Sequence, residues 1–169
     1  RFNSAKASAA IHLSPLSEAQ ASACNEITES MRANAVTLLH GVTGSGKTHV
    51  YMEIIEQVIA RGRQAILLIP EIALTYQTLL RFYLRFGNRV SVINSTLSPG
   101  ERYDQCQRAK NGDIDIIIGP RSALFTPFPN LGVIIMDEEH ESSYKSEGNP
   151  KYHARETAME AARLHGAAL

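Results

Sequence analysis

The stretch Gly41-Val-Thr-Gly-Ser-Gly-Lys-Thr48 decides the fold of this chain. It stands between a short apolar run at residues 36–39, typical of a strand, and an amphipathic pattern that begins near Thr48 and is typical of a helix. Glycines at this spacing let the backbone turn tightly around phosphates, the lysine reaches the β- and γ-phosphates, and the last hydroxyl can coordinate Mg²⁺. The sequence therefore predicts a nucleotide-binding loop made of Gly41, Val42, Thr43, Gly44, Ser45, Gly46, Lys47 and Thr48.

Short apolar runs alternate with helical patterns along most of the remaining chain. The runs are rich in Ile and Val and too short for helices, and they cover residues 65–69, 90–93, 114–118 and 133–136. The helical patterns cover residues 17–33, 48–61, 74–86, 99–110 and 152–165. This alternation predicts an α/β fold, a doubly wound and mostly parallel sheet with helices on both faces, with ligands at the carboxyl ends of the strands.

Two of these helices carry capping signals at their starts. Ser17 with Gln20, and Ser98 with Glu101, have the spacing of a capping box, in which each side chain bonds the backbone N–H of the other residue. Pro99 suits the first turn of the second of these helices, because its missing N–H has no partner there in any case.

The length of the chain fits one domain, and its net charge of zero gives no long-range attraction to nucleic acid. A chain of 169 residues can bury a core without disulfides or metals. Residues 1–14 are expected to form a linker or the tail of a preceding domain, which leaves residues 15–169 as one domain. Lysine plus arginine and aspartate plus glutamate are equal at 17 each, so contact with nucleic acid would need a local basic patch.

The cysteines point to a reducing compartment. Cys24 and Cys106 form no Cys-x-x-Cys pair, so zinc is not expected in this chain. The sequence has no signal peptide and no long apolar segment. We therefore expect a soluble, cytoplasmic protein that does not contact membranes.

A pair of acids follows the last predicted strand. The run Asp-Glu-Glu-His begins at Asp137, directly after residues 133–136 and at the sheet edge where the phosphate loop is also expected. In a phosphate-loop ATPase the aspartate holds Mg²⁺, usually through water, and the next glutamate orients or deprotonates the attacking water. We therefore assign Thr48 and Asp137 to the metal, and Glu138, Lys47 and Asp137 to catalysis. An exposed acidic turn is the weaker alternative.

Five motifs, in their order along the chain, resemble one helicase family. They are the phosphate loop, Leu68-Ile-Pro-Glu-Ile-Ala-Leu-Thr75, Asn94-Ser95 with Leu97-Ser98, Gly119 with Arg121-Ser122-Ala123, and Asp137-Glu138-Glu139-His140. Together they resemble the first motor domain of the PriA family, the bacterial primosomal replication-restart DNA helicases of superfamily 2. The sequence departs from the family pattern at His49 and at Pro120, which removes a backbone donor near an expected DNA contact.

The resemblance implies a RecA-like P-loop NTPase domain that couples ATP hydrolysis to 3′-to-5′ movement on DNA during the restart of stalled replication forks. It implies ATP and Mg²⁺ as cofactors, single-stranded and forked DNA as substrates, and a second RecA-like domain in the same longer chain. Primosome proteins and single-stranded-DNA-binding protein are implied as partners, and the bacterial nucleoid as the location.

The resemblance also implies roles for residues outside the loop. Gln20 resembles the glutamine that reads adenine in such helicases, since an amide can donate to and accept from the base. The capping box is the alternative, and one glutamine could serve both roles in turn. Thr75, Arg121 and Ser122 lie in motifs that grip the DNA backbone, with groups that suit phosphate oxygens. For Arg121 an exposed salt bridge is the alternative.

Residues 141–155 interleave aromatic and basic side chains and resemble the aromatic-rich loop by which PriA and RecQ-type helicases couple DNA contact to ATP hydrolysis. Aromatic rings could stack on bases while cations approach phosphates, and the residues concerned are Tyr144, Tyr152, His153, Lys145, Lys151 and Arg155. For Tyr152, packing on the following helix is the alternative. His140 is expected to relay this coupling, because no second histidine or cysteine lies at metal-ligand spacing.

Two other functions stay open from the sequence. A nucleotide or nucleoside kinase also has a phosphate loop and a parallel sheet, but no arginine-rich lid is recognisable after the sheet and the strand-end acids suit the activation of water. The chain could instead hold nucleotide and DNA without turnover. Assays of phosphoryl transfer to nucleosides separate the first alternative from an ATPase.

Overall fold

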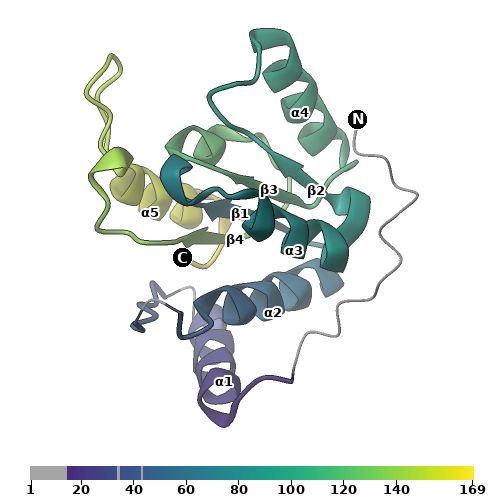
Figure 1. The fold of residues 1–169 in the computed structure, drawn as a ribbon, viewed down its shortest axis with the longest axis vertical. Helices are drawn as coiled ribbons and strands as arrows, with labels where there is room; N and C mark the ends of the chain where they lie inside the picture. Colours follow the sequence, from purple (N-terminus) through teal and green to yellow (C-terminus); the bar gives the residue numbers. More distant parts are fainter. Residues whose placement is uncertain (1–14, 34, 43) are drawn as a thin grey trace.

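The computed structural model describes residues 15–33, 35–42 and 44–169 (Figure 1). Residues 1–14, expected to form a linker, and Thr43 of the phosphate loop lie outside the described residues. The α-helices are α1 (Glu18–Arg32), α2 (Lys47–Ala60), α3 (Tyr76–Phe86), α4 (Pro99–Asn111) and α5 (Ala154–His165). None of these helices combines the length and the apolar content that crossing a membrane requires.

The strands form one parallel sheet in the order β2-β3-β1-β4. Their bounds are β1 (Gln64–Leu68), β2 (Val90–Val92), β3 (Ile116–Gly119) and β4 (Leu131–Met136). The four apolar runs after the phosphate loop therefore pair as predicted. Because all four strands run the same way, their carboxyl ends meet at one edge of the sheet, and the segments that follow β1, β3 and β4 lie together there.

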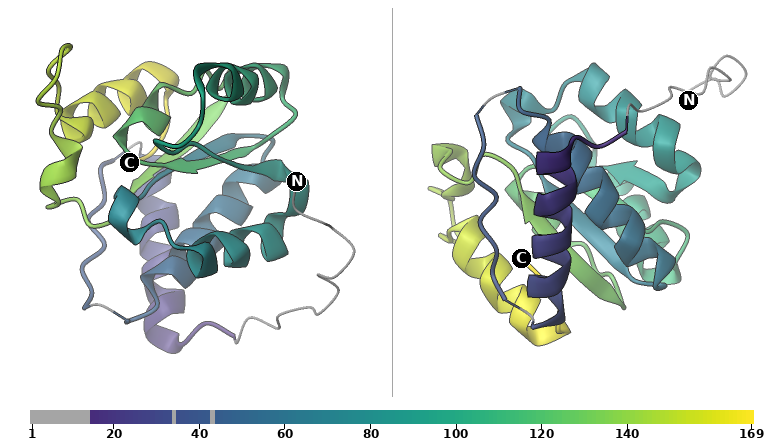
Figure 2. Two further views of the ribbon diagram at one scale, coloured as in Figure 1. Left: turned by 45° about the horizontal axis from the view of Figure 1, so that its top comes forward. Right: turned by 90° about the horizontal axis from the view of Figure 1, so that it is seen from below.

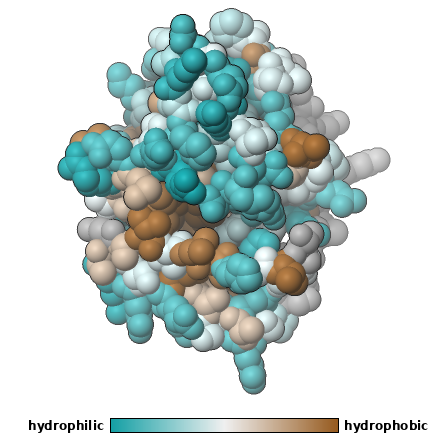
Figure 3. Space-filling view, turned by 90° about the vertical axis from the view of Figure 1, so that its left-hand side faces the viewer, coloured by the Kyte–Doolittle hydropathy of each residue, from teal (hydrophilic) through white to brown (hydrophobic). Residues whose placement is uncertain are grey.

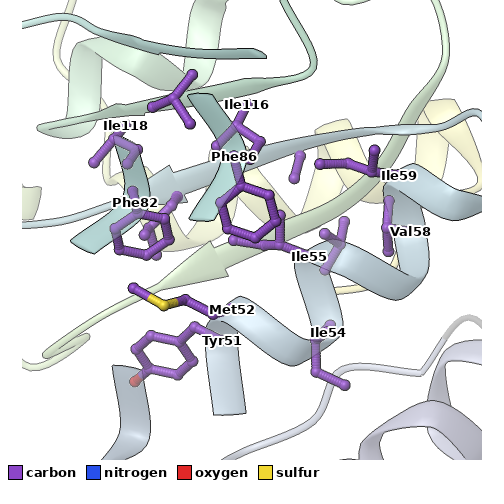
Figure 4. Close-up of a cluster of buried hydrophobic side chains, with 14 of the residues drawn as sticks. Tyr51, Met52, Ile54, Ile55, Val58, Ile59, Phe82, Phe86, Ile116 and Ile118 are labelled. Carbon is purple, nitrogen blue, oxygen red and sulfur yellow. The ribbon is translucent and has the colours of Figure 1, made fainter. Parts of the chain in front are cut away.

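Helices cover both faces of the sheet, as the sequence predicts (Figures 1 and 2). Alternate residues of β1 point to opposite faces. Leu67 joins an apolar cluster with side chains of α2 and α3, whereas Ile66 joins a second cluster with Ala158 of α5 and Ala109 of α4. Figure 4 shows the first cluster, in which side chains of α2 meet Phe82 and Phe86 of α3 beneath β3.

The predicted caps and the glycine stop after α3 are confirmed, whereas the helices predicted from residues 74 and 152 begin at Tyr76 and Ala154. Both capping boxes form, the first between Ser17 and Gln20 and the second between Ser98 and Glu101. Helix α3 ends at Gly87, whose φ of 57° lies in the left-handed region that glycine adopts at little cost. The sequence did not predict the short 3₁₀ helices at the carboxyl ends of strands, which include η2 (Glu71–Ala73), η4 (Arg121–Phe125) and η5 (Ser142–Tyr144).

The strand predicted at residues 36–39 is wrong. Residues 35–42 have no regular secondary structure, and the side chains of Val36 and Leu38 are 61% and 76% exposed. A strand needs a neighbouring backbone along its length, and within the described part of the chain residues 36–39 make a single backbone hydrogen bond, from the Thr37 N–H to the Leu169 carbonyl at 2.8 Å. A cavity of about 490 Å³ is lined by this segment and by β4. Figure 3 shows a hollow in the surface that is bordered by hydrophobic residues.

Candidate nucleotide-binding site

The phosphate loop leads into the N-terminus of α2 with an uncapped turn. Gly46 is the N-cap residue, with a φ of 83°, and no side chain of the described chain caps the helix there. The N-termini of α1, α3, α4 and α5 are capped by Ser17, Thr75, Ser98 and His153. Within the described residues the N–H groups of Lys47 and Thr48 have no acceptor, whereas the His49 N–H donates to the Gly46 carbonyl at 2.9 Å. A helix N-terminus with N–H groups left over in this way binds anions such as phosphate.

Lys47 begins α2 and folds its side chain back over the loop. Its ammonium group donates to the carbonyl oxygen of Gly41 at 2.7 Å and to that of Val42 at 3.4 Å. The same nitrogen lies 3.7 Å from Oε1 of Glu138. The lysine thus joins the phosphate loop to the acid pair after β4, as the expected site requires.

The acid pair sits at the end of β4 in a tight turn. The Asp137 N–H donates to the Leu68 carbonyl at 2.9 Å, which extends the pairing of β4 with β1 by one residue. Glu138 has a φ of 49°, a left-handed conformation that costs a residue other than glycine about 1–3 kcal/mol. His140 Nε2 lies 3.8 Å from Glu138 Oε2. The turn therefore directs both carboxylates toward the same region.

Burial is the main influence on the Asp137 carboxyl. Desolvation raises its pKa above the ordinary value, while the hydrogen bond from Tyr51 and the charge of Lys47 act in the opposite direction. The charge of Glu138 raises it further. A carboxylate in this setting gains from a nearby cation, because the cation offsets the cost of keeping the charge out of water.

The donor set fits a magnesium nucleotide. Mg²⁺ prefers oxygen ligands and is usually held by one or two carboxylates together with substrate phosphates. The Thr48 hydroxyl in the first turn of α2 and the Asp137 carboxylate supply such oxygens, and Lys47 and the uncapped helix supply positive charge for phosphates. The structural observation that supports a bound phosphate is that no described side chain caps the N-terminus of α2.

Gln20 bridges the first helix and the phosphate loop. Its Oε1 accepts the Ser17 N–H at 2.9 Å, and its Nε2 donates to the Ser45 carbonyl at 3.3 Å. A Cβ at Gly46 would come within 2.3 Å of that nitrogen, so this approach needs glycine. The capping alternative is confirmed, and the adenine-reading role stays a prediction.

The stacking role predicted for Tyr144 is wrong. Its side chain is 0% exposed, and its hydroxyl lies within hydrogen-bond distance of the Asp137 carbonyl (2.7 Å) and the Leu68 carbonyl (3.1 Å). A ring enclosed in the core cannot stack on a base. The spacing of aromatic residues in a polar loop does not reveal which ring turns inward. Tyr144 instead fastens the start of the loop to the ends of β1 and β4.

Arg121 holds this loop against η4. Its guanidinium donates to the carbonyl oxygens of Ser143 and Lys145 and forms no salt bridge with any described residue, so the ion-pair alternative is not supported. On the same short helix Phe125 is 57% exposed and packs edge-on against Tyr152, with ring centroids 5.3 Å apart. Sequence reasoning missed Phe125, although an aromatic residue four positions after a predicted DNA-contacting arginine was a usable signal.

The remaining predicted DNA residues lie around this edge in varied roles. Thr75 caps α3, Ser122 is half-buried in η4, and Lys145 is paired with Glu147 at 3.4 Å. His153 caps α5 through Nδ1. Arg155 pairs with Glu139 at 3.0 Å, on the wall of the cavity that also contains Lys47 and Glu138. Arg155 therefore lines the same cavity as two residues of the candidate nucleotide site.

The parallel sheet, the uncapped loop-to-helix turn and the strand-end acids define a P-loop domain of the RecA-like class. The chain belongs to the family described as "Type III restriction enzyme, res subunit", whose model matches residues 13–164.

Known relatives support the resemblance found in the motifs. Over 153 residues the chain is 50% identical to replication restart protein PriA of Bacillus subtilis (strain 168), covering 89% of this chain and 19% of that protein. It is 49% identical over 150 residues to replication restart protein PriA of Synechocystis, covering 88% of this chain and 18% of that protein. The predicted resemblance to PriA is thus confirmed, and the chain spans about a fifth of the length of these relatives.

A solved structure supports the fold. The chain matches RecG in the structure of RecG bound to a three-way DNA junction, with a TM-score of 0.60 and 29% sequence identity. The match covers 71% of this chain and 17% of the RecG chain. It confirms the predicted RecA-like α/β architecture.

Proposed function

We propose that this chain is the ATP-binding motor domain of a 3′-to-5′ DNA helicase that acts in the restart of stalled replication forks. The observation that carries the proposal is the meeting of Lys47 with Glu138, at 3.7 Å, beside an uncapped helix N-terminus. It is supported by the extensive identity with proteins named replication restart protein PriA. ATP and Mg²⁺ are the proposed cofactors.

In this function each residue of the site has a separate task. Lys47 and the N–H groups of α2 hold the phosphates, and the hydroxyl of Thr48 and the carboxylate of Asp137 hold the metal. Mg²⁺, when bound, neutralises negative charge on the phosphate oxygens. Glu138 takes a proton from water, and its present ion pair with Lys47 is released when the lysine turns to phosphate.

The contacts of the aromatic-rich loop support a route from DNA to the acid pair. Arg121 holds the loop from the η4 side, and Tyr144 holds the Asp137 carbonyl from the same loop. A strand of DNA that contacts η4 or Tyr152 would therefore act on the backbone that carries Asp137. We assign Thr75, Ser122, Lys145 and His153 to the same DNA-facing edge, and His140 to the relay beside Glu138.

The same proposal includes the rest of the helicase. A second RecA-like domain of a longer polypeptide would complete the ATP site and supply the arginine finger. Forked and single-stranded DNA, primosome proteins and single-stranded-DNA-binding protein are the proposed partners at the nucleoid. We propose that residues 1–14 connect to a preceding domain, so that residues 15–169 form the motor domain itself.

The test is phosphate release by the full-length protein with ATP and Mg²⁺, with and without single-stranded DNA. We expect release that DNA stimulates and that Lys47→Ala abolishes. A parallel reaction offers nucleosides and nucleoside monophosphates as acceptors. Transfer of phosphate to an acceptor, with no release to water, would identify a kinase and overturn the proposal.

A further inference from the structure

We infer that Tyr51 is a positioning residue, which holds the Asp137 carboxylate in the orientation that a metal–nucleotide complex needs. The inference rests on the proposed function, and it deepens that function by adding a residue that the phosphate-loop and strand-end motifs do not include. Its basis is a hydrogen bond across the two halves of the site: the Tyr51 hydroxyl donates to Asp137 Oδ1 at 2.9 Å.

The position of Tyr51 on its helix makes this bond possible. Tyr51 lies four residues after Lys47 and three after Thr48, and residues at these spacings share one face of a helix. One face of α2 therefore presents the phosphate-binding lysine, the metal-binding hydroxyl and the phenol that contacts Asp137. Any shift of α2 relative to β4 moves all three together.

The ring of Tyr51 is fixed by packing, so that its hydroxyl has a defined place. The residue is 9% exposed and belongs to the apolar cluster beneath the sheet. Figure 4 shows the ring beside Met52, with the oxygen pointing away from the cluster. Packing thus anchors the apolar body of the side chain and leaves its polar end for the carboxylate.

Asp137 is held at its backbone as well as its side chain. Its N–H donates to the Leu68 carbonyl, and its own carbonyl oxygen lies 2.7 Å from the Tyr144 hydroxyl. With the backbone fixed, rotation of the side chain is the main freedom left to Asp137, and the bond to Tyr51 restricts it. The bond occupies Oδ1, and a carboxylate retains a second oxygen for a metal or its water.

A residue such as Tyr51, which orients a metal-binding carboxylate by a hydrogen bond, is expected to affect metal affinity more than folding. Residues that orient metal ligands cost about 10- to 100-fold in metal affinity or activity when they are replaced. Tyr51→Phe removes the hydroxyl and keeps the packed ring. We therefore expect a variant that folds normally and binds nucleotide normally without metal, but that gains less affinity when Mg²⁺ is added.

The experiment measures the affinity of the full-length protein for a fluorescent ATP analogue, once with Mg²⁺ and once with EDTA. The matched control is Tyr103→Phe, which removes a hydroxyl from an exposed tyrosine on α4. We expect Tyr51→Phe to reduce the Mg²⁺-dependent gain in affinity about tenfold or more, with the EDTA value and the melting temperature equal to those of the control. Mn²⁺ binding followed by electron paramagnetic resonance should weaken in parallel.

A second variant shows whether the effect passes through Asp137. In an Asp137→Asn background, Tyr51→Phe should cause no further loss of Mn²⁺ or Mg²⁺ dependence. An unchanged Mg²⁺ gain in Tyr51→Phe, an equal loss of affinity with EDTA, or an additive loss in the double variant would each overturn the inference. A wild-type protein that binds no nucleotide would instead overturn the proposed function, so the two failures are distinguishable.

Discussion

Lys47 is the residue whose environment explains most about the site. In this structure its ammonium group is satisfied by two loop carbonyls and lies near Glu138, so it is held close to where phosphates would lie. Lys47→Ala should lower nucleotide affinity about 10- to 100-fold, since a hydrogen bond to a charged group contributes about 1.5–3 kcal/mol. Calorimetric titration with Mg-ATP measures this. A melting temperature close to that of the parent protein is the control, and unchanged affinity would contradict the site.

Glu138 is expected to act in turnover rather than in binding. Glu138→Gln keeps the size of the side chain but cannot accept a proton, so hydrolysis by the full-length protein should fall about 10²- to 10⁴-fold while nucleotide affinity is retained. Steady-state phosphate release and nucleotide titration measure the two quantities separately. Glu139→Gln, next in sequence and paired with Arg155, is the matched control and should retain turnover. Normal hydrolysis by Glu138→Gln would remove Glu138 from the mechanism.

Tyr144 should act mainly on stability. Tyr144→Phe leaves the Asp137 carbonyl without its hydroxyl donor, while the Leu68 carbonyl keeps the N–H of Asp137. Loss of one such partner costs about 1–3 kcal/mol of unfolding free energy. Denaturant unfolding of the variant measures this cost. Tyr103→Phe on exposed α4 is the control and should change stability by less than about 0.5 kcal/mol. A Tyr144→Phe variant as stable as this control would show that the Asp137 carbonyl does not need the hydroxyl.

At the scale of elements, η4 and the aromatic-rich loop form a unit at the carboxyl edge of the sheet. Hydrogen bonds from Arg121 of η4 to loop carbonyls connect the two, and so does the edge-on contact between Phe125 of η4 and Tyr152 of the loop. Replacing both rings, Phe125→Ala with Tyr152→Ala, should reduce the stimulation of hydrolysis by DNA more than the basal rate. The rings lie outside the acid pair, and base stacking contributes about 1–3 kcal/mol per base.

The control for this pair is Leu164→Ala, a truncation of an exposed apolar residue of α5. Hydrolysis is measured in the full-length protein across a titration of single-stranded DNA. Leu164→Ala should leave both the basal and the stimulated rates unchanged. Equal losses of both rates in the double variant would mean that the rings support the fold or the nucleotide site, and not DNA coupling.

At the scale of the whole molecule, the nucleotide site is open on one side. The cavity beside the phosphate loop is walled by β4 and by residues 36–41, and its polar rim includes Lys47, Glu138 and Arg155. In related phosphoryl-transfer systems an arginine finger contributes about 10³- to 10⁵-fold in rate. The isolated 169-residue chain should therefore bind Mg-nucleotide weakly and release almost no phosphate, even with DNA.

Calorimetry and phosphate release on the purified chain test this expectation, with the full-length protein as the positive control. Arg155, which is paired with Glu139, lines the same cavity as Lys47 and Glu138. The opposite result is robust DNA-stimulated turnover by the isolated chain, together with loss of that turnover in the Arg155→Ala variant. That result would show that the chain supplies its own arginine finger and would contradict a site shared between two domains.

Much of the architecture was predictable because it depends on local sequence. Capping boxes at Ser17 and Ser98, glycine stops, and short Ile- and Val-rich runs each act within a few residues, and the helices and four parallel strands follow from them. The motifs likewise predicted that the phosphate loop and the acids after β4 meet, and Lys47 does lie 3.7 Å from Glu138, although the described residues before the loop form no strand.

Tertiary structure alone decided the remaining features, because each depends on what lies across the fold. Residues 36–39 have a strand-like composition, but within the part of the chain that the structure describes they share only one backbone hydrogen bond, with Leu169, and form no strand. Tyr144 lies in a polar loop, yet its ring is buried in the second apolar cluster and its hydroxyl lies against the carbonyls of Leu68 and Asp137. In the sequence Tyr51 is indistinguishable from an ordinary core residue of a helix. Only the structure shows that its hydroxyl bonds Asp137, 86 positions along the chain. Sequence periodicity reports which face of a helix or strand is apolar, and it contains no information about which distant polar atom that face will meet.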